Sequence, residues 1–240
     1  HAYYTKNKDY RVSDDYYKRL EAAMKEEEGL LGAKIYEDNL VDFVQVFGNK
    51  DLEKYDALQY VKNSLNYVEN HFSSPALSGF LVNRIVSNYV EGSGIDNLEE
   101  LMGTYDAKVK DPKLRADFEE IRSKWAKVAK GEPSPWFSYL DINGKMTSVA
   151  DLSGKYIYID VWATWCGPCR GEIPHLKKLE HKYKNNNIHF VSISCDQNKE
   201  AWENMVKDEK LGGIQLHNGG DRAFMDAYMI KGIPRFILLD

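Results

Sequence analysis

The first half of the chain has apolar residues at the spacing of amphipathic helices. Three stretches carry them at every third or fourth position, which predicts one buried stripe on each helix. The stripes are Leu58, Val61, Leu65 and Val68; Leu77, Leu81, Ile85 and Tyr89; and Leu114, Phe118, Ile121, Trp125 and Val128. A capping residue followed by proline, at 74–75 and at 111–112, begins the second and third helices. Gly131 is expected to end the third helix.

Other segments of the first half are less regular. Residues 16–28 are predicted to be helical. Asp96 and Glu99 have the spacing of a capping box, which predicts a short helix over 98–105. The apolar residues of 40–47 fit neither the helical nor the strand period, so both assignments stay open there. The tyrosines that we interpret as packing residues rather than ligand platforms are Tyr3, Tyr4, Tyr10, Tyr16 and Tyr17.

After a proline-bearing linker at 131–135, the pattern changes to strands that alternate with helices. The predicted strands are 136–141, 146–150, 156–162, 188–195 and 235–239, and the predicted helices are 167–184, 199–207 and 222–229. Asn143–Gly144 is a two-residue turn signal, so the first two strands should form a hairpin. Strand, helix and strand in succession predict a parallel pair with a right-handed crossover. We therefore predict a mostly α-helical domain over 1–131 and an α/β domain over 132–240.

Composition narrows the class of protein without naming a function. The 240 residues are 43% hydrophobic and 29% charged, which excludes a disordered or collagen-like chain. A net charge of −5 gives no sign of a nucleic-acid partner, and no apolar run is long enough to cross a membrane. The chain begins at His1 without a targeting segment, so we expect a mature or engineered start, and a removed N-terminal anchor stays open.

The segment Trp165-Cys-Gly-Pro-Cys169 carries the chemistry. It follows a predicted strand and opens the next helix, where unpaired amides stabilise a thiolate, the nucleophile in disulfide exchange. Cys166 is therefore predicted to be the more acidic and more exposed cysteine, and to attack. Cys169 lies within one turn and would resolve the mixed disulfide. Pro168 suits the first turn, where no amide is needed.

Two other interpretations of these cysteines are weaker. A zinc site would need further ligands, but Cys195 is isolated and the histidines at 175, 181 and 189 form no ligand-like pair with it. We therefore predict no metal. A purely structural disulfide would not need the placement between strand and helix. Cys195 is interpreted as a free buried cysteine, with a role as an extra redox partner less favoured. Residues His175, His181, Lys177, Lys178 and Lys182 are assigned to the solvent-facing side of the helix.

Residues 158–169 resemble the active-site stretch of thioredoxins. The resemblance implies that Cys166 attacks and Cys169 resolves, that Trp162 and Trp165 are the two active-site tryptophans, and that Asp160 is the buried aspartate of that family. It also matches Pro174 to a helix-kinking proline and 232–235 to the loop with a cis-proline. Pro234 would then face the disulfide, and the Ile233 backbone would pair with an extended substrate. The implied substrate groove consists of Trp165, Gly167, Pro168, Ile233 and Pro234.

A closer resemblance is to the extracytoplasmic TlpA/ResA group of thioredoxin-like proteins. It rests on the predicted hairpin, on Leu152-Ser-Gly-Lys155 and on Glu172-Ile-Pro174, and it covers about residues 133–240. The resemblance implies a periplasmic or membrane-tethered bacterial protein. We recognise no family motif in the helical half. A thioredoxin fold should continue past Asp240 with a strand and a helix, so we expect a truncated chain.

Two carboxylates flank the cysteine pair in the sequence. Asp160 interrupts an apolar strand, so burial should raise its pKa and let it take a proton from Cys169. We favour this over a merely hydrogen-bonded strand residue. Glu172 lies one turn after Cys169, where a proton-shuttling role and an ordinary surface position both stay open.

These residues predict a thiol-disulfide oxidoreductase that uses the Cys166–Cys169 disulfide and no cofactor. The Gly-Pro dipeptide between the cysteines resembles the reducing members of the family, so we expect reduction of protein disulfides, supplied by an upstream thiol donor. The alternative is a binding or scaffold protein with a thioredoxin-like recognition module. A peroxidase is less favoured, because the cysteine environment differs.

Overall fold

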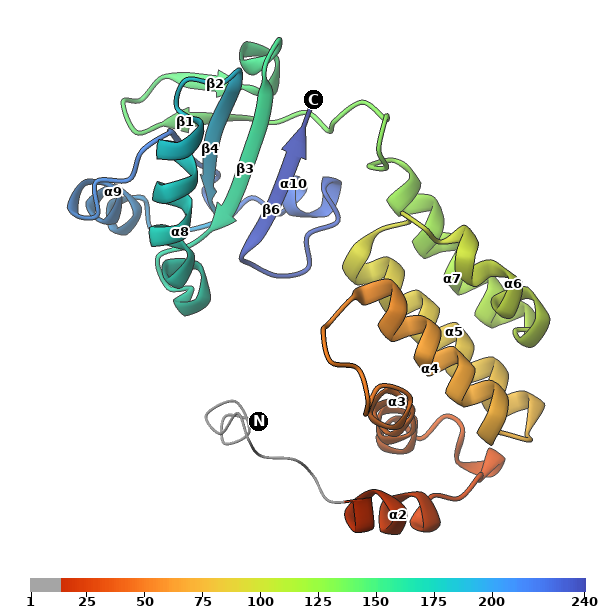
Figure 1. Cartoon of the computed structure of the whole chain (residues 1–240). Coiled ribbons are helices and arrows are strands. Elements are labelled where there is room, and N and C mark those ends of the chain that lie inside the picture. Colours follow the sequence, from red (N-terminus) through yellow and green to blue (C-terminus); the bar gives the residue numbers. More distant parts are fainter. Residues whose placement is uncertain (1–13) are drawn as a thin grey trace. The chain divides into compact units, whose positions relative to one another are not determined.

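The structure is a computed structural model that describes residues 14–240 (Figure 1). The chain forms two compact units, His1–Ala129 and Lys130–Asp240, which divide close to the linker found in the sequence. Tyr3, Tyr4 and Tyr10 lie outside the described residues, as does the side chain of Tyr16.

Helices make up the N-terminal unit, as the sequence predicts. Its described elements are α2 (Asp14–Ala23), the 3₁₀ turn η1 (Glu28–Leu30), α3 (Lys34–Gly48), α4 (Ala57–His71), α5 (Pro75–Ser93), α6 (Glu99–Lys108) and α7 (Pro112–Ala126). The predicted stripes lie on α4, α5 and α7. Their buried members are Val61, Leu65, Val68, Leu77, Leu81, Ile85, Tyr89, Phe118 and Trp125. α4 packs against α5, and α5 packs against α7, so the stripes lie where neighbouring helices meet (Figure 1).

The unassigned segment 40–47 is helical and belongs to α3. Its buried residues Leu40, Val41, Val44 and Phe47 share one helical face. The sequence pattern was ambiguous because Val46 is apolar but lies off that face, with 47% of its surface exposed. Tertiary packing therefore selects the helix.

Two of the three predicted helix starts are confirmed. Ser74 Oγ accepts the Leu77 amide at 3.1 Å, and Asp111 Oδ1 accepts the Lys113 amide at 2.7 Å. The capping box at Asp96 and Glu99 was wrong, because the N-cap of α6 is Leu98, which makes no side-chain cap.

The Asp96 carbonyl instead accepts the Tyr89 hydroxyl at 2.8 Å.

The end of α7 also differs from the prediction. The helix stops at Ala126 rather than near Gly131, because the Lys127 and Val128 amides bond to carbonyls three residues back and tighten the last turn.

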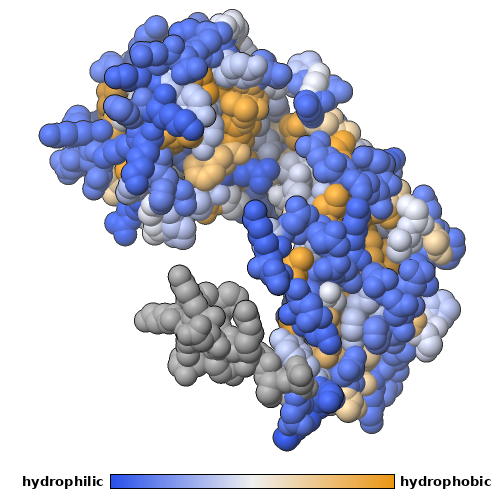
Figure 2. All heavy atoms as spheres, viewed as in Figure 1, coloured by the Kyte–Doolittle hydropathy of each residue, from blue (hydrophilic) through white to orange (hydrophobic). Residues whose placement is uncertain are grey.

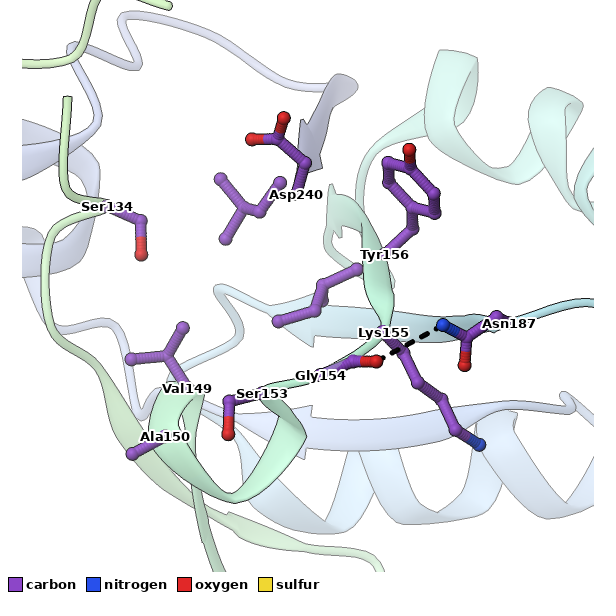
Figure 3. Close-up of a pocket in the computed structure, with 11 residues that line it drawn as sticks. Ser134, Val149, Ala150, Ser153, Gly154, Lys155, Tyr156, Asn187 and Asp240 are labelled. Carbon is purple, nitrogen blue, oxygen red and sulfur yellow. Dashed lines mark hydrogen bonds between the residues drawn. The ribbon is translucent and has the colours of Figure 1, made fainter. Parts of the chain in front are cut away.

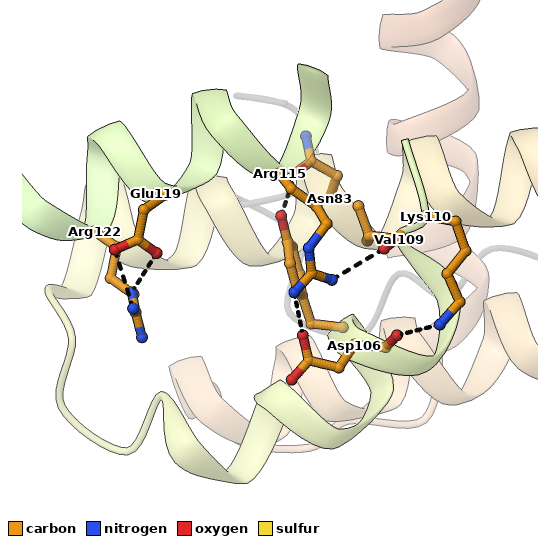
Figure 4. A network of polar contacts seen from close by, with 8 residues as sticks. Asn83, Asp106, Val109, Lys110, Arg115, Glu119 and Arg122 are labelled. Carbon is orange, nitrogen blue, oxygen red and sulfur yellow. Dashed lines mark hydrogen bonds and ion pairs between the residues drawn. The ribbon is translucent and has the colours of Figure 1, made fainter. Parts of the chain in front are cut away.

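Polar contacts hold the turn between α6 and α7 (Figure 4). Arg115 of α7 donates to the Val109 carbonyl at 3.1 Å and to Asp106 Oδ1 at 2.7 Å. Lys110 donates to the Asp106 carbonyl at 2.6 Å. Because Val109 is fully buried, the bond from Arg115 satisfies a backbone carbonyl that water does not reach easily.

The strands of the described part form one six-stranded sheet in the order β2-β1-β5-β4-β3-β6. The strands are β1 (Ser138–Asp141), β2 (Met146–Ser148), β3 (Tyr156–Trp162), β4 (Ile188–Ser194), β5 (Ile214–His217) and β6 (Arg235–Leu239). The remaining elements are the 3₁₀ turn η2 (Val149–Leu152), α8 (Gly167–Tyr183), α9 (Lys199–Asp208) and α10 (Arg222–Ala227). The thioredoxin-like α/β class is confirmed, as are the hairpin β1–β2 and the parallel pair β3–β4.

One strand escaped the sequence analysis. β5 has only four residues, and it follows the two glycines Gly212 and Gly213, so its short alternation gave no signal of its own. It pairs parallel with β4 and antiparallel with β1. β5 therefore joins the hairpin to the central strands.

Alternate residues of β3 face opposite sides of the sheet. On one side Ile159 and Val161 pack with Phe224 of α10. On the other side Trp162 packs with Trp202 of α9 and with both cysteines of the motif. Figure 1 shows α8 lying across this second face. The motif is thus fixed to a packed part of the unit.

Some apolar side chains remain on the surface. Figure 2 shows apolar residues among hydrophilic ones. On β6, Phe236 is 39% exposed and Leu238 is 63% exposed. Within residues 14–240, no helix combines the length and the apolar character needed to span a bilayer.

Candidate active site

Cys166 and Cys169 form a disulfide at the point where α8 begins. β3 ends at Trp162, a short loop follows, and Cys166 is the N-cap of α8. The two Cα atoms are 5.3 Å apart. Cys166 is 5% exposed and Cys169 is 3% exposed, so the predicted difference in exposure is slight in the oxidised protein.

The first turn of α8 brings a backbone amide to the Cys166 sulfur. Its Sγ accepts the Cys169 amide at 3.2 Å. The same amide, and the partial positive charge at the start of α8, favour a thiolate on Cys166 once the disulfide is reduced. Pro168 occupies the first turn of α8 and removes no hydrogen bond there. This geometry suits Cys166 to nucleophilic attack.

The loop before β6 lies against the disulfide. The Ile233–Pro234 peptide bond is cis, and the Ile233 carbonyl oxygen is 3.8 Å from Cys166 Sγ. Ile233 also packs against the apolar clusters on both faces of the sheet. Among the other residues assigned to the substrate groove, Gly167 and Pro168 are exposed, and Trp165 is 69% exposed. The disulfide therefore has an accessible rim with an apolar residue on it.

A buried aspartate that the sequence analysis missed anchors the active-site loop. Asp196 is 2% exposed and accepts the Thr164 amide at 3.0 Å and the Thr164 hydroxyl at 2.7 Å. It also accepts the Ser194 hydroxyl at 2.7 Å. Its position just after the parallel strand β4 was the available signal, since polar residues at that edge often serve a site.

Asp160 lies under the disulfide, as the sequence predicts for a buried strand residue. It is 8% exposed and lines a small cavity together with Cys169. Burial, together with the smaller effect of the Glu172 and Glu180 charges, raises the pKa of Asp160 to about 7, while a hydrogen bond from Ser192 opposes the shift. A carboxyl group that titrates near neutral pH is suited to take up and release a proton.

Glu172 is half-buried on α8, one turn beyond Cys169. Its charge reaches β3 on this face, because it raises the pKa of Asp160 and of Tyr158. No hydrogen bond joins its carboxylate to either cysteine among the described residues. Glu172 therefore acts on Asp160 and Tyr158 through its charge.

Glu180, Ser192 and Gln215 line the cavity beside Asp160 as well. They come from α8, β4 and β5, and sequence reasoning did not single them out. Their proximity depends on strand register and helix packing, which a local motif does not encode.

The other residues weighed as ligands lie apart from this arrangement. Cys195 is a half-buried free thiol whose pKa burial raises to about 11. His175 and His181 are exposed on α8, as predicted. Among the described residues, no three His, Cys, Asp or Glu side chains are arranged to hold a metal ion.

A larger hollow of about 450 Å³ lies at the beginning of β3 (Figure 3). Val149, Ser153 and Lys155 line it, and Asn187 donates to the Gly154 carbonyl at 3.1 Å across its floor. The disulfide follows the opposite end of β3, so this hollow is separate from the redox centre.

Known proteins resemble part of this chain in sequence. The thioredoxin-like family matches residues 154–240. The thiol-disulfide oxidoreductase ResA of Bacillus cereus (strain ATCC 10987 / NRS 248) is 30% identical over 119 residues, which are 49% of this chain and 68% of that protein. The ResA of Bacillus subtilis (strain 168) is 28% identical over 113 residues, which are 47% of this chain and 63% of that protein.

Solved structures give similar matches. The solution structure of a protein from Bacteroides vulgatus assigned as a thiol-disulfide oxidoreductase is 71% identical, covers 47% of this chain and 75% of that chain, and has a TM-score of 0.42. The thioredoxin domain of another thiol-disulfide oxidoreductase from Bacteroides vulgatus is 30% identical, covers 47% and 81% of the two chains, and has a TM-score of 0.44. On the similarity to ResA, this chain belongs to the ResA-like thiol-disulfide oxidoreductases, a group within the thioredoxin-like family.

Proposed function

We propose that this protein reduces disulfides of other proteins through its Cys166–Cys169 dithiol, without a further cofactor. The observation that carries the proposal is the position of Cys166 Sγ at the start of α8, where it accepts the Cys169 amide at 3.2 Å. The buried Asp160 beside Cys169 supplies a base for the second step.

The reaction takes place in two exchanges. The Cys166 thiolate attacks one sulfur of the substrate disulfide, and the electron pair of the broken S–S bond leaves on the other substrate sulfur, which takes a proton from water. The Cys169 thiol then gives its proton to Asp160, and its sulfur attacks Cys166 Sγ. The second substrate thiolate leaves and is protonated. The protein is oxidised by two electrons and again contains the Cys166–Cys169 disulfide.

Turnover requires an upstream thiol donor that reduces the protein again. The Gly-Pro dipeptide between the cysteines supports the reducing direction, since it is the dipeptide of reducing thioredoxins that the sequence resembles. The resemblance to the TlpA/ResA group supports a location outside the cytoplasm of a bacterium, in the periplasm or tethered to a membrane.

Single cysteine variants test the proposal against a scaffold role. Insulin reduction with dithiothreitol as donor measures the activity of the wild type and of Cys166→Ser, Cys169→Ser and Cys195→Ser. We expect the first variant to be inactive and the third to match the wild type. The second variant, reduced beforehand and then freed of dithiothreitol, should accumulate a mixed disulfide with insulin. A wild type that does not accelerate insulin reduction over dithiothreitol alone would contradict the proposal and favour a binding role.

A further inference from the structure

A row of polar residues crosses the sheet beneath α8. Strand register places Asp160 of β3 beside Ser192 of β4, and Ser192 beside Gln215 of β5. These residues are 8%, 4% and 3% exposed, so the row is buried along its length. Buried polar groups usually make hydrogen bonds, so a buried polar atom without one is a place where a water or another group can bind.

Gln215 shows such a departure. Its Nε2 donates to the Gly212 carbonyl at 2.6 Å, whereas its buried Oε1 accepts no hydrogen bond from the described residues. Gln215 lines the cavity that also borders Asp160 and Cys169. The cavity volume is about 10 Å³, which is room for about one water molecule. A water there would find Gln215 Oε1 and the Asp160 carboxyl group as partners.

Glu180 of α8 lines the same cavity and is half-buried. Its carboxylate rests against the glycines that precede β5. A Cβ atom added to Gly212 would lie 2.5 Å from Glu180 Oε2, and one added to Gly213 would lie 3.1 Å from Oε1. The two glycines thus leave room for this carboxylate.

Charges around the pair come from several elements. Glu172 acts on Asp160 from α8, and Tyr158 is its neighbour on β3. Lys177 of α8 acts on Glu180 and lies 4.0 Å from Glu209 at the end of α9. β6 contributes the apolar Phe236 opposite Asp160. Burial raises the pKa of Glu180, while Lys177 opposes the shift.

We propose that Glu180 is a positioning residue for the exchange reaction, and that it conducts the proton of Asp160 to the surface through one water held at Gln215. The inference rests on the proposed function. Glu180 acts through Asp160 and does not contact the sulfur atoms.

One proton passes along this route from Cys169 to solvent, and each group that accepts it also releases it. The Cys169 thiol gives its proton to the Asp160 carboxylate, and the resulting thiolate attacks Cys166 Sγ. Asp160 then protonates the cavity water, which passes a proton to the Glu180 carboxylate, and Glu180 releases it to solvent. No electron moves along the route, and both carboxylates return to their starting charge.

Substitutions at Glu180 and Gly212 test the route in two ways. E180Q removes the charge, and G212A displaces the carboxylate while the charge remains. E203Q, at a half-buried glutamate of α9 that lies 3.3 Å from Lys199, is the control with the same loss of charge. The rate of the resolving step, followed by Trp165 fluorescence in single turnover with a peptide disulfide, should rise with pH through a midpoint near the Asp160 pKa of about 7 in the wild type.

We expect E180Q and G212A to lower this midpoint by about 0.3 pH unit or more, because a neighbouring negative charge no longer disfavours ionised Asp160. The plateau rate should fall by about threefold or more, since the base is weaker and its proton has lost its exit. E203Q should leave both quantities unchanged, and E180D should restore part of the plateau.

A second readout does not depend on turnover. Carboxyl-carbon NMR of the reduced protein reports the titration of Asp160 directly, and its midpoint should fall in E180Q and G212A. Wild-type midpoints and rates in both variants would overturn the role of Glu180 while insulin reduction still supported the proposed function. A wild type that fails in insulin reduction would instead overturn the proposed function. The change in the Asp160 titration midpoint would still show whether Glu180 and Asp160 are electrostatically coupled.

Discussion

Replacing Asp160 by Asn should stabilise the folded protein, and more so as the pH rises. Burial raises the pKa of Asp160 from 3.8 to about 7, so the folded state holds on to a proton that the unfolded state releases. Between these two pKa values the folded state binds more protons, and its stability therefore falls as the pH rises. Below pH 3.8 Asp160 carries no penalty, and above pH 7 the penalty is complete.

The size of the effect follows from the shift. A difference of about three pKa units corresponds to about 4 kcal/mol, which is the penalty that Asn would remove at pH 8. At pH 5 only about 1.6 kcal/mol of that penalty has developed, so the gain should grow by about 2.4 kcal/mol between pH 5 and pH 8. Asn keeps the size of the side chain, so packing should change little.

Guanidinium denaturation of the oxidised proteins at both pH values measures this gain. Four of the five tryptophans lie in the α/β unit, so fluorescence follows mainly the unit that contains Asp160. E203Q, with the same charge change on α9, controls for net charge. Equal gains at pH 5 and pH 8, or a less stable variant at pH 8, would refute the reasoning about a buried carboxyl group with a raised pKa.

Three further outcomes follow from the site. Cys169→Ser should trap the attacked substrate on Cys166 as a mixed disulfide, detected as an added mass that dithiothreitol removes, whereas a variant that releases substrate at the wild-type rate would exclude Cys169 as the resolving residue. Asp196→Ala should destabilise the protein by about 2–4 kcal/mol in denaturant titration, because the Thr164 amide and hydroxyl lose their acceptor in a buried place; a change below about 0.5 kcal/mol would contradict the anchoring role. Cys195 should resist alkylation by iodoacetamide at pH 8, since burial raises its pKa to about 11, and rapid labelling of the native protein would show that the thiol is not protected in this way.

Much of the fold follows from local sequence signals. The stripes on α4 and α5, the caps at Ser74 and Asp111, and the strand β3 each depend on residues a few positions apart, so the pattern itself contains the information. The capping box at Asp96 failed because the chain turns at Asn97, whose φ is 58°, and the helix starts after Leu98. Local spacing does not reveal such a turn.

The site residues likewise differ in how far their contacts could be predicted from local sequence. The cysteine pair and Asp160 lie within one strand-loop-helix segment, so the sequence predicted their proximity. Ser192 and Gln215 join them only through the register of β3, β4 and β5, and β5 was too short to be recognised. Contacts that depend on sheet register are fixed by the packing of the whole unit, which explains why the polar row and Glu180 required the structure.

The reduction potential of the Cys166–Cys169 pair tests the central claim most directly. Equilibration in dithiothreitol or glutathione buffers, with Trp165 fluorescence as the reporter, gives the potential in one titration. If the protein reduces protein disulfides, the transition should lie near the value of about −270 mV known for thioredoxin. A transition near about −120 mV, the range of strong thiol oxidants, would contradict the account, and so would the absence of any reversible transition.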